Sequence, residues 1–301
     1  MSIFGKKIKI VTHDGSFHAD DVFATASLSI LLEKRRERFE LIRTRNAEII
    51  NAGDFVFDVG GVYDAEKNRF DHHQKEFKEQ RANGITYSSF GLIWKKFGAE
   101  ICDGEEIKNH IDEVLVEQVD ATDNGINIFS PTTSHVSNYD ISSVVASFLP
   151  DWGEDESTDN FHSAVLFAKR ILEKEITKNH SILKAKAILE EAYKKSEDKR
   201  LLVVEVEIPR YLVHVVSSDY PELLYAVFPD EKSWKVFAVR KKPGSFENRK
   251  NLPATWAGLM GESLQQVSGV DDAVFCHRGL FLAVAQSRAG AIKLAQIAVE
   301  S

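Results

Sequence analysis

Three short polar segments carry most of the side chains in this sequence that could bind a metal ion or transfer a proton. The first covers residues 13–21 (HDGSFHADD), the second is Asp58, and the third is the triplet Asp71-His72-His73. They offer imidazole nitrogens and carboxylate oxygens but no thiolate. This mixture of ligands suits borderline-hard divalent ions such as manganese, magnesium or zinc, rather than iron–sulfur or copper–thiolate chemistry.

A fourth place is Asp123, which follows a helical pattern and begins the turn-forming sequence Asp123-Asn124-Gly125. Together the four places supply enough ligands for two ions that share a bridging carboxylate. Two divalent ions about 3.5–4 Å apart stabilise both the attacking and the leaving oxygen of a phosphoryl displacement, and a metal-bound hydroxide is the nucleophile. The residue types therefore predict hydrolysis of a phosphoester by one or two ions.

Each of these places also has an ordinary structural explanation. Asp58 could cap a turn, Asp123 could belong to a plain turn, and Asp20 and Asp21 could satisfy the N-terminus of a helix. Considered singly, only the Asp-His-His triplet favours a site. Considered together, the places do favour one, because four of the ten histidines fall in two tight clusters that each follow a strand pattern.

Strand and helix patterns place these residues at one edge of a parallel sheet. Apolar residues recur at helical spacing from about residue 19 to residue 36. The β-rich runs cover residues 8–12, 39–43 and 54–59. A strand, a helix and two further strands in this order begin a parallel α/β sheet. Ligands of such sheets bind beyond the carboxyl ends of the strands, which is where His13 and Asp58 fall.

The rest of the chain supplies more helices and then a second group of strands. Helical patterns cover residues 88–98, 105–121, 142–149 and 159–196. Strand patterns cover residues 201–206, 211–216 and 234–239. We therefore expect two α/β domains: a metal-binding catalytic domain over residues 1–200, which includes the long helical segment, and a smaller substrate-binding domain over residues 201–301.

The composition is that of an ordinary globular protein, and the sequence has no internal repeat. The chain has 301 residues, of which 43% are hydrophobic and 28% are charged. Its net charge of −8 argues against binding of duplex nucleic acid through one large basic face, although a narrow basic channel suffices for a single strand.

The cellular compartment is indicated by the cysteines and by the absence of targeting patterns. Cys102 and Cys276 form no CxxC pair and fit a reducing compartment. No apolar stretch approaches the roughly 20 residues of a spanning helix, and no signal-peptide core follows the basic residues 1–7. We expect a cytoplasmic protein that makes no membrane contact.

The motifs, taken in order, resemble the DHH phosphoesterase superfamily, which is named after the triplet found here at residues 71–73. Closer similarity is to the Myg family, the melanocyte proliferating gene product and its relatives. The segments that carry this similarity are residues 11–21, 57–61, 70–74, 119–125, 252–259 and 275–277. A bare DHH triplet is a weak signal, but the motifs in this order are specific. Members are regarded as metal-dependent hydrolases, and the eukaryotic ones as exonucleases that act on RNA.

The resemblance implies a set of metal ligands. The six implied ligands are His13, His18, Asp20, Asp58, His72 and Asp123. Asp58 would bridge the two ions, one of them held by the two histidines of the first motif. Asp120 competes with Asp123 for the last position. His18 stands where the superfamily usually has an aspartate, which leaves the choice of metal open.

Roles in catalysis and substrate binding are also implied by the resemblance. His73 would face the substrate phosphate, Asp71 would orient the histidine ligands, and Asp58 would act through the metal bridge. The C-terminal domain departs from the superfamily, which often has a glycine-rich substrate loop there; in its place His277, Arg278 and Arg288 could bind the substrate phosphate.

These observations predict a hydrolase of phosphoester bonds that depends on a divalent metal, with manganese favoured over magnesium or zinc. Its substrate would be RNA, another oligonucleotide or a small nucleotide, and the enzyme would be an exonuclease or a phosphodiesterase. Two alternatives stay open. One is a non-catalytic metal- or nucleotide-binding regulatory protein, and the other is a hydrolase of a pyrophosphate or peptide bond. Assembly into a homo-oligomer is also open.

Overall fold

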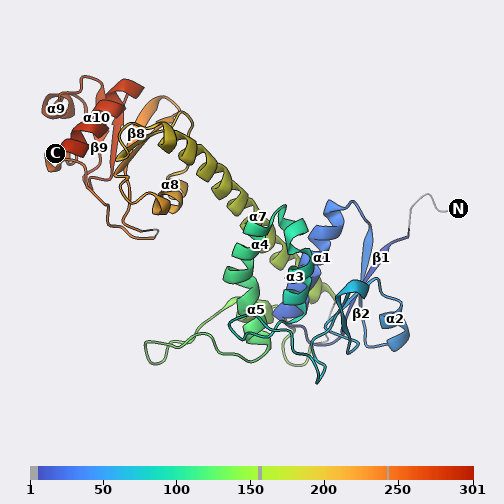
Figure 1. The fold of residues 1–301 in the computed structure, drawn as a ribbon. Helices are drawn as coiled ribbons and strands as arrows, with labels where there is room; N and C mark the ends of the chain where they lie inside the picture. Colours follow the sequence, from blue (N-terminus) through green and yellow to red (C-terminus); the bar gives the residue numbers. More distant parts are fainter. Residues whose placement is uncertain (1–5, 155–157, 243) are drawn as a thin grey trace. The chain divides into compact units, whose positions relative to one another are not determined.

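The computed structural model describes residues 6–154, 158–242 and 244–301 (Figure 1). The chain divides into two compact units, the first ending at Lys178 and the second beginning at Asn179. This division falls inside the long helix α7 (Thr158–Lys195). Each unit contains one five-stranded sheet flanked by helices, which confirms the predicted α/β class. A boundary near residue 200 stays a prediction.

The sheet of the first unit has the strand order β2-β1-β3-β5-β4. Its strands are β1 (Ile8–Thr12), β2 (Phe39–Arg43), β3 (Phe55–Phe57), β4 (Tyr63–Asp64) and β5 (Arg69–Phe70). Neighbours pair in parallel, except that β4 runs antiparallel to β5 at the edge. The three predicted strands are therefore confirmed, the third of them shorter than expected.

The register of the parallel strands aligns the polar residues that follow them. Val11 lies opposite Val56, and Phe57 lies opposite Phe70. Continued past the strand ends, the same register sets His13 beside Asp58 and Asp58 beside Asp71. This confirms that these residues leave the sheet at one carboxyl edge, as expected for a ligand site in a parallel sheet.

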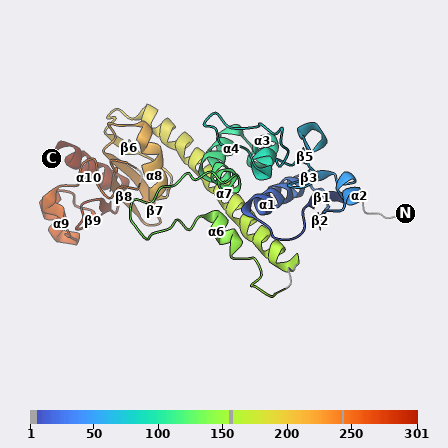
Figure 2. The ribbon, with the colours of Figure 1, turned by 90° about the horizontal axis from the view of Figure 1, so that it is seen from below.

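Helices cover both faces of this sheet, and Figure 2 shows the strands between α1 and α2. The helices are α1 (Ala19–Lys34), α2 (Ala47–Asn51) and α3 (Ser89–Cys102). Val56 packs with Ile50 of α2 on one face. Phe55, which alternates with Val56 along the strand, contacts Phe97 of α3 on the other face, with ring centroids 5.8 Å apart. Apolar residues that alternate along the strand thus pack against helices on both faces of the sheet.

The helical pattern over residues 105–121 forms three consecutive segments. They are α4 (Glu105–Ile111), a π-helical segment (Asp112–Val116) and α5 (Glu117–Asp123). A shorter helix, α6 (Ile141–Ala146), precedes α7, and one 3-10 turn covers Ala65–Lys67. Asp123 is the last residue of α5, which confirms that this carboxylate stands where a helix meets a loop.

The sheet of the second unit has the order β6-β7-β8-β10-β9. Its strands are β6 (Leu201–Val203), β7 (Tyr225–Asp230), β8 (Ser233–Ala238), β9 (Ala273–Cys276) and β10 (Leu282–Ala285). Only β6 and β7 pair in parallel. The helices are α8 (Arg210–Val216), α9 (Gly261–Ser268) and α10 (Arg288–Glu300), with 3-10 turns at Ser217–Asp219 and Ala254–Trp256.

Two apolar layers hold the second unit together, one on each face of its sheet. Val227 of β7 packs with Leu294 of α10 on one face. Phe228, the next residue, packs on the other face with Leu189 of α7 and Leu212 of α8. In Figure 1, α8 and α10 lie on opposite sides of β8.

The predicted strand over residues 211–216 is wrong, because this segment forms helix α8. The β-branched valines of YLVHVV suggested a strand. However, Leu212, Val213 and Val216 are buried apolar residues, at 4%, 1% and 3% exposure, and their spacing describes one face of a helix. Packing of this face against the sheet overrides the local preference of the residues. The strands β7, β9 and β10 were not predicted.

No helix in the ranges that the structure describes is both long enough and apolar enough to span a membrane.

Candidate metal centre

His13 follows β1 directly and points its ring into the buried edge of the sheet. Its Nδ1 atom lies 2.9 Å from the backbone carbonyl of Asp14, which can only accept a hydrogen bond. The proton of the neutral ring therefore sits on Nδ1, and Nε2 is the atom that can bind a metal. Nε2 lies 3.3 Å from Oδ2 of Asp21 and 3.1 Å from Oδ2 of Asp58.

Asp58 directly follows β3 and has a backbone φ of 55°, in the left-handed region. Aspartate and asparagine tolerate this region better than other residues with a Cβ. The sharp change of direction turns its carboxylate into the site, so that Oδ2 faces His13 while Oδ1 lies 3.5 Å from Nε2 of His72. Asp58 thereby stands between two histidines that come from different segments.

A second group gathers around His72. Its Nε2 atom lies 3.8 Å from Oδ2 of Asp20 and 3.3 Å from Oδ2 of Asp123. Asp20 comes from the first turn of α1, and Asp123 from the last turn of α5. Three segments far apart in the sequence therefore meet at one imidazole nitrogen.

Asp20 is held in place by the N-terminus of α3. The backbone N–H groups of Ser89 and Phe90 and the hydroxyl of Ser88 donate to its carboxylate. Phe90 and Ser88 bind Oδ1, which leaves Oδ2 as the oxygen nearest His72. The start of α3 thus fixes the orientation of one candidate ligand.

Asp71 orients His73 rather than His72. Its Oδ1 atom accepts the backbone N–H of His73 at 3.0 Å and lies 2.9 Å from Nδ1 of the same residue. The backbone N–H of Gly61 donates to its Oδ2 at 2.6 Å. The His73 side chain is 63% exposed, and its Nδ1 atom lies 3.5 Å from Oδ1 of Asp58. His73 is therefore the histidine of the triplet that faces outward from the site.

Of the two carboxylates near the end of α5, Asp123 faces His72 and Asp120 does not take part. Asp120 is fully buried. It forms an ion pair with Arg81 and accepts hydrogen bonds from the hydroxyl of Ser88 and the backbone N–H of Gly91. Its oxygens are thus used by the scaffold around the start of α3.

His18, which the sequence indicated as a ligand, belongs to neither group. It is exposed, and its ring centroid lies 6.3 Å from that of His13. Asp21 takes the corresponding place beside His13, while its Oδ1 atom accepts the backbone N–H of His18. The sequence offered only one signal for Asp21, the pair of adjacent aspartates at the start of a buried helix, and this was explained equally well by helix capping.

The described residues contain three groups whose ligand atoms all lie within 4.8 Å of one another. These are His13, Asp21 and Asp58; Asp20, His72 and Asp123; and Asp58, His72 and His73. Among the atoms at their centre, Oδ2 of Asp21, Oδ1 of Asp58 and Nε2 of His72 are buried without a hydrogen-bond partner. Buried polar atoms are rarely left unpaired. The donor set therefore fits one or two divalent cations.

Electrostatics at this edge favour a cation. Burial raises the pKa of Asp21 to about 7, and it also raises the pKa values of Asp20 and Asp123, to which the charge of Asp58 adds. Burial opposes the charged form of His13, but the hydrogen bond to Asp58 and the charge of Asp21 raise its pKa to about 9. Crowded carboxylates disfavour their own ionisation, and a divalent cation would remove that penalty.

A cavity of about 220 Å³ opens beside the second group. His18, Asp20 and Asp123 form its polar wall, and the apolar wall includes Phe17 and Leu149. Since two candidate ligands line this space, a small polar molecule placed there would lie against the metal centre.

The residues indicated in the C-terminal part of the chain lie in the second unit. Arg288 forms an ion pair with Glu205 at 2.7 Å. Nδ1 of His277 accepts the backbone N–H of Gly279 at 2.9 Å, and its ring packs on Phe281 with centroids 4.3 Å apart. Arg278 is exposed. Their proposed contact with phosphate stays a prediction.

Comparison with known proteins identifies relatives along almost the whole chain. A family model described as an uncharacterised protein family (UPF0160), MYG1_exonuc, matches residues 9–299. MYG1 exonuclease of Homo sapiens is 32% identical over 96% of this chain and 85% of its own length. MYG1 protein C694.04c of Schizosaccharomyces pombe is 30% identical over 97% of this chain and 98% of its own. A MYG1 protein of Chlamydia pneumoniae is 32% identical over 93% and 92%.

Proposed function

The chain belongs to the MYG1_exonuc family, UPF0160, and we propose that it is a hydrolase of phosphodiester bonds that depends on a divalent metal and removes nucleotides from the end of RNA or a short oligonucleotide. The observation that supports this proposal is the close approach of His13 and His72 to the carboxylate of Asp58. Nε2 of His72 and Oδ1 of Asp58 are buried without a hydrogen-bond partner. Several relatives bear the name exonuclease, and this name supports the choice of substrate.

In the proposed centre, Asp58 joins two sets of ligands. On the first side the ligands are His13 and Asp21. Nε2 of His13 lies 3.3 Å from Oδ2 of Asp21 and 3.1 Å from Oδ2 of Asp58. Asp20 and Asp123 hold the second side with His72. When bound here, divalent ions supply a hydroxide nucleophile near neutral pH and compensate the charge on the phosphoryl oxygens. The absence of thiolates and the mixture of nitrogen and oxygen ligands support manganese.

His73 is the proposed contact to the substrate. Its hydrogen bond to Asp71, opposed by partial burial, raises the pKa of its ring, so the imidazolium form persists to higher pH. Asp71 fixes Nδ1 and thereby directs Nε2 away from the carboxylates. A protonated ring in this orientation donates to a phosphate oxygen or gives a proton to the leaving oxygen.

We also propose finer assignments that rest on the sequence analysis. They are membership of the DHH superfamily, a cytoplasmic location, and binding of substrate by His277, Arg278 and Arg288 in the second unit. The metal centre in the first unit supports the catalytic part of the proposal without them.

End-labelled single-stranded RNA tests the proposal. The purified protein is incubated with the RNA and manganese, with manganese and EDTA, and with neither, and the products are resolved by length. Stepwise shortening that requires manganese is the expected result. Failure to cleave RNA, a DNA strand or a dinucleotide, although manganese binds, would contradict the proposal and favour a non-catalytic binding protein.

A further inference from the structure

Helix α8 brings Arg210 and His214 into contact because residues four positions apart share one helix face. Nε of Arg210 lies 3.0 Å from Nε2 of His214. A guanidinium can only donate, so Nε2 accepts and the proton of the ring sits on Nδ1. Nδ1 is buried and has no hydrogen-bond partner among the described residues. His214, which is 6% exposed, therefore holds an unused N–H donor.

A second guanidinium stands close to this pair. Arg240 follows β8, and its Nε atom is also buried without a partner in the described chain. Burial and the charge of Arg240 lower the pKa of Arg210. Burial together with the charges of Arg210, Arg240 and Arg249 lowers the pKa of His214 to about 4. The charges of three arginines thus act on a neutral imidazole.

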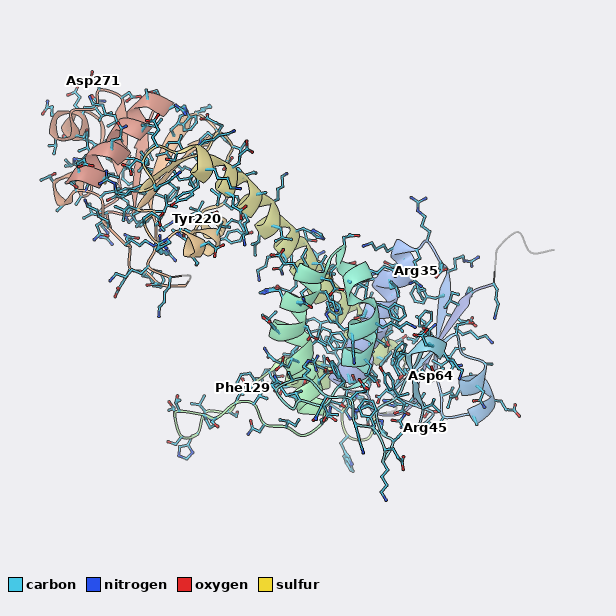
Figure 3. The ribbon with its side chains drawn as sticks, in the orientation of Figure 1. Arg35, Arg45, Asp64, Phe129, Tyr220 and Asp271 are labelled. Carbon is cyan, nitrogen blue, oxygen red and sulfur yellow. The ribbon has the colours of Figure 1, made fainter. Side chains whose placement is uncertain are left out.

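Two other arginines of the same unit, Arg200 and Arg249, have partners for their guanidinium groups. Arg200 pairs with Asp198 and Glu300 at 2.9 and 2.8 Å. Arg249 donates to backbone carbonyls, those of Ser217, Tyr220 (labelled in Figure 3) and Leu223. In the part of the chain that the structure describes, no carboxylate pairs with Arg210 or Arg240. Placing unpaired cations together in a partly buried region is unfavourable unless an anion joins them.

The surroundings of the two arginines suit a nucleotide strand. The guanidinium of Arg240 lies 5.3 Å from the ring centroid of Phe246, and this ring is 92% exposed. Lys241 and Lys242, the residues that follow Arg240 in the sequence, line a hollow of about 550 Å³ together with Arg249. Guanidinium groups bind phosphate through two parallel hydrogen bonds, and an exposed aromatic ring stacks on a base without sequence preference.

We propose that Arg210, His214 and Arg240 form a phosphate-binding site that holds the backbone of a single-stranded oligonucleotide. The identity of this ligand rests on the proposed function, whereas the three side chains lie in the second unit and are independent of the metal ligands. They also differ from His277, Arg278 and Arg288, the residues that the sequence indicated for this role.

Binding of labelled single-stranded RNA to the full chain in EDTA tests the site without turnover. The variants are Arg210→Gln, Arg240→Gln and both together, because glutamine keeps part of the stem while it removes the charge. Arg200→Gln is the matched control, since it removes the same charge from an arginine that already has carboxylate partners. Thermal unfolding of each variant shows whether it is folded.

We expect each substitution at Arg210 or Arg240 to weaken binding about tenfold, the loss typical of a charge-assisted hydrogen bond. The double variant should lower the slope of log K against log salt by about 1.4, since each lost phosphate contact on a single strand accounts for about 0.7. The Arg200→Gln control should keep both the affinity and the slope. Equal binding by the double variant and the control would overturn the site.

Inorganic phosphate tests whether the site binds free phosphate or the phosphates of a nucleic-acid strand. If phosphate raises the melting temperature of the wild type but not of the double variant while RNA binding is unchanged, the site takes free phosphate and the inference of a nucleic-acid strand is wrong. Hydrolysis of bis(p-nitrophenyl) phosphate with manganese tests the metal centre separately. Loss of RNA binding in the double variant would support the site even if the wild type cleaves no ester.

Discussion

Nε2 of His13 lies 3.1 Å from Oδ2 of Asp58. The contact follows from the topology, because β1 and β3 are parallel neighbours and their register sets these two residues side by side beyond the strand ends. A carboxylate that meets one histidine through Oδ2 and another, His72, through Oδ1 would be able to hold a cation on each side.

Asp21→Asn should lower metal affinity and turnover by at least about tenfold, since changes to groups that merely orient metal ligands already cost about 10–100-fold. The amide oxygen can still accept the N–H of His18, so the start of α1 should persist. Metal titration by calorimetry and the rate of RNA cleavage measure the two effects.

Asp14→Asn is the matched control for this substitution. Asp14 lies in the loop that leads to α1, is exposed, and forms an ion pair with Arg45 at 3.2 Å; Arg45 is labelled in Figure 3. The metal affinity and turnover of the Asp14→Asn variant should equal those of the wild type. Equal losses in both variants would show that the loop, and not the Asp21 carboxylate, is responsible.

His72→Ala and His73→Ala should have different effects although the residues are adjacent. His72 is buried among three carboxylates, so its loss should reduce metal content. His73 is largely exposed and held by Asp71, so its loss should slow turnover while metal content stays nearly unchanged. Elemental analysis beside steady-state kinetics separates the two. Equal metal loss in both variants would refute the separate roles.

Arg81→Gln should lower the free energy of unfolding by about 3–5 kcal/mol, because it leaves the buried carboxylate of Asp120 without its cation. Arg35→Gln, which breaks the more exposed pair with Glu100, should cost less than about 1 kcal/mol. Denaturation by urea gives both values. Similar small losses would mean that the Arg81–Asp120 pair contributes no more than a surface pair.

The free energy of unfolding should depend on pH through His214, whose pKa in the folded chain is about 4 against an ordinary value of 6.5. The unfolded chain binds this proton between these pH values and the folded chain does not. Stability from this group is therefore complete above about pH 6.5 and is lost as the pH falls towards 4.

The size of this effect follows from the shift in pKa. It is on the order of 3–4 kcal/mol, at about 1.4 kcal/mol for each unit of pKa. His214→Asn should remove this part of the pH dependence, as measured by urea denaturation in a buffer free of phosphate. Parallel pH curves for the wild type and the variant would contradict the prediction.

The sequence predicted the residues that follow the strands, because strand ends in a parallel sheet converge whatever the details of packing. The sequence did not show whether Asp21 or His18 lies beside His13 in the candidate metal centre. Both stand within one turn of the start of α1, and which of them faces His13 depends on how that helix enters the core. The sequence also did not show that Asp120 has a structural role, because its partner Arg81 comes from a distant loop.

Helix α8 shows the same limit for secondary structure. The residues of YLVHVV fit a strand locally, and only packing of Leu212 and Val216 against the second sheet selects the helix. The meeting of Arg210, His214 and Arg240 depends on that packing. No spacing in the sequence predicts it, since Arg240 comes from beyond two intervening strands.

Anomalous diffraction from crystals soaked in manganese tests the central claim most directly. The wild type should show two peaks about 3.5–4 Å apart, the separation typical of two-metal hydrolases, with Asp58 between them. Asp58→Asn, which keeps the left-handed backbone that asparagine tolerates, should remain folded but lose at least one peak and its turnover. Full turnover by this variant, or a wild-type crystal with no manganese at His13 and His72, would contradict the proposed metal centre.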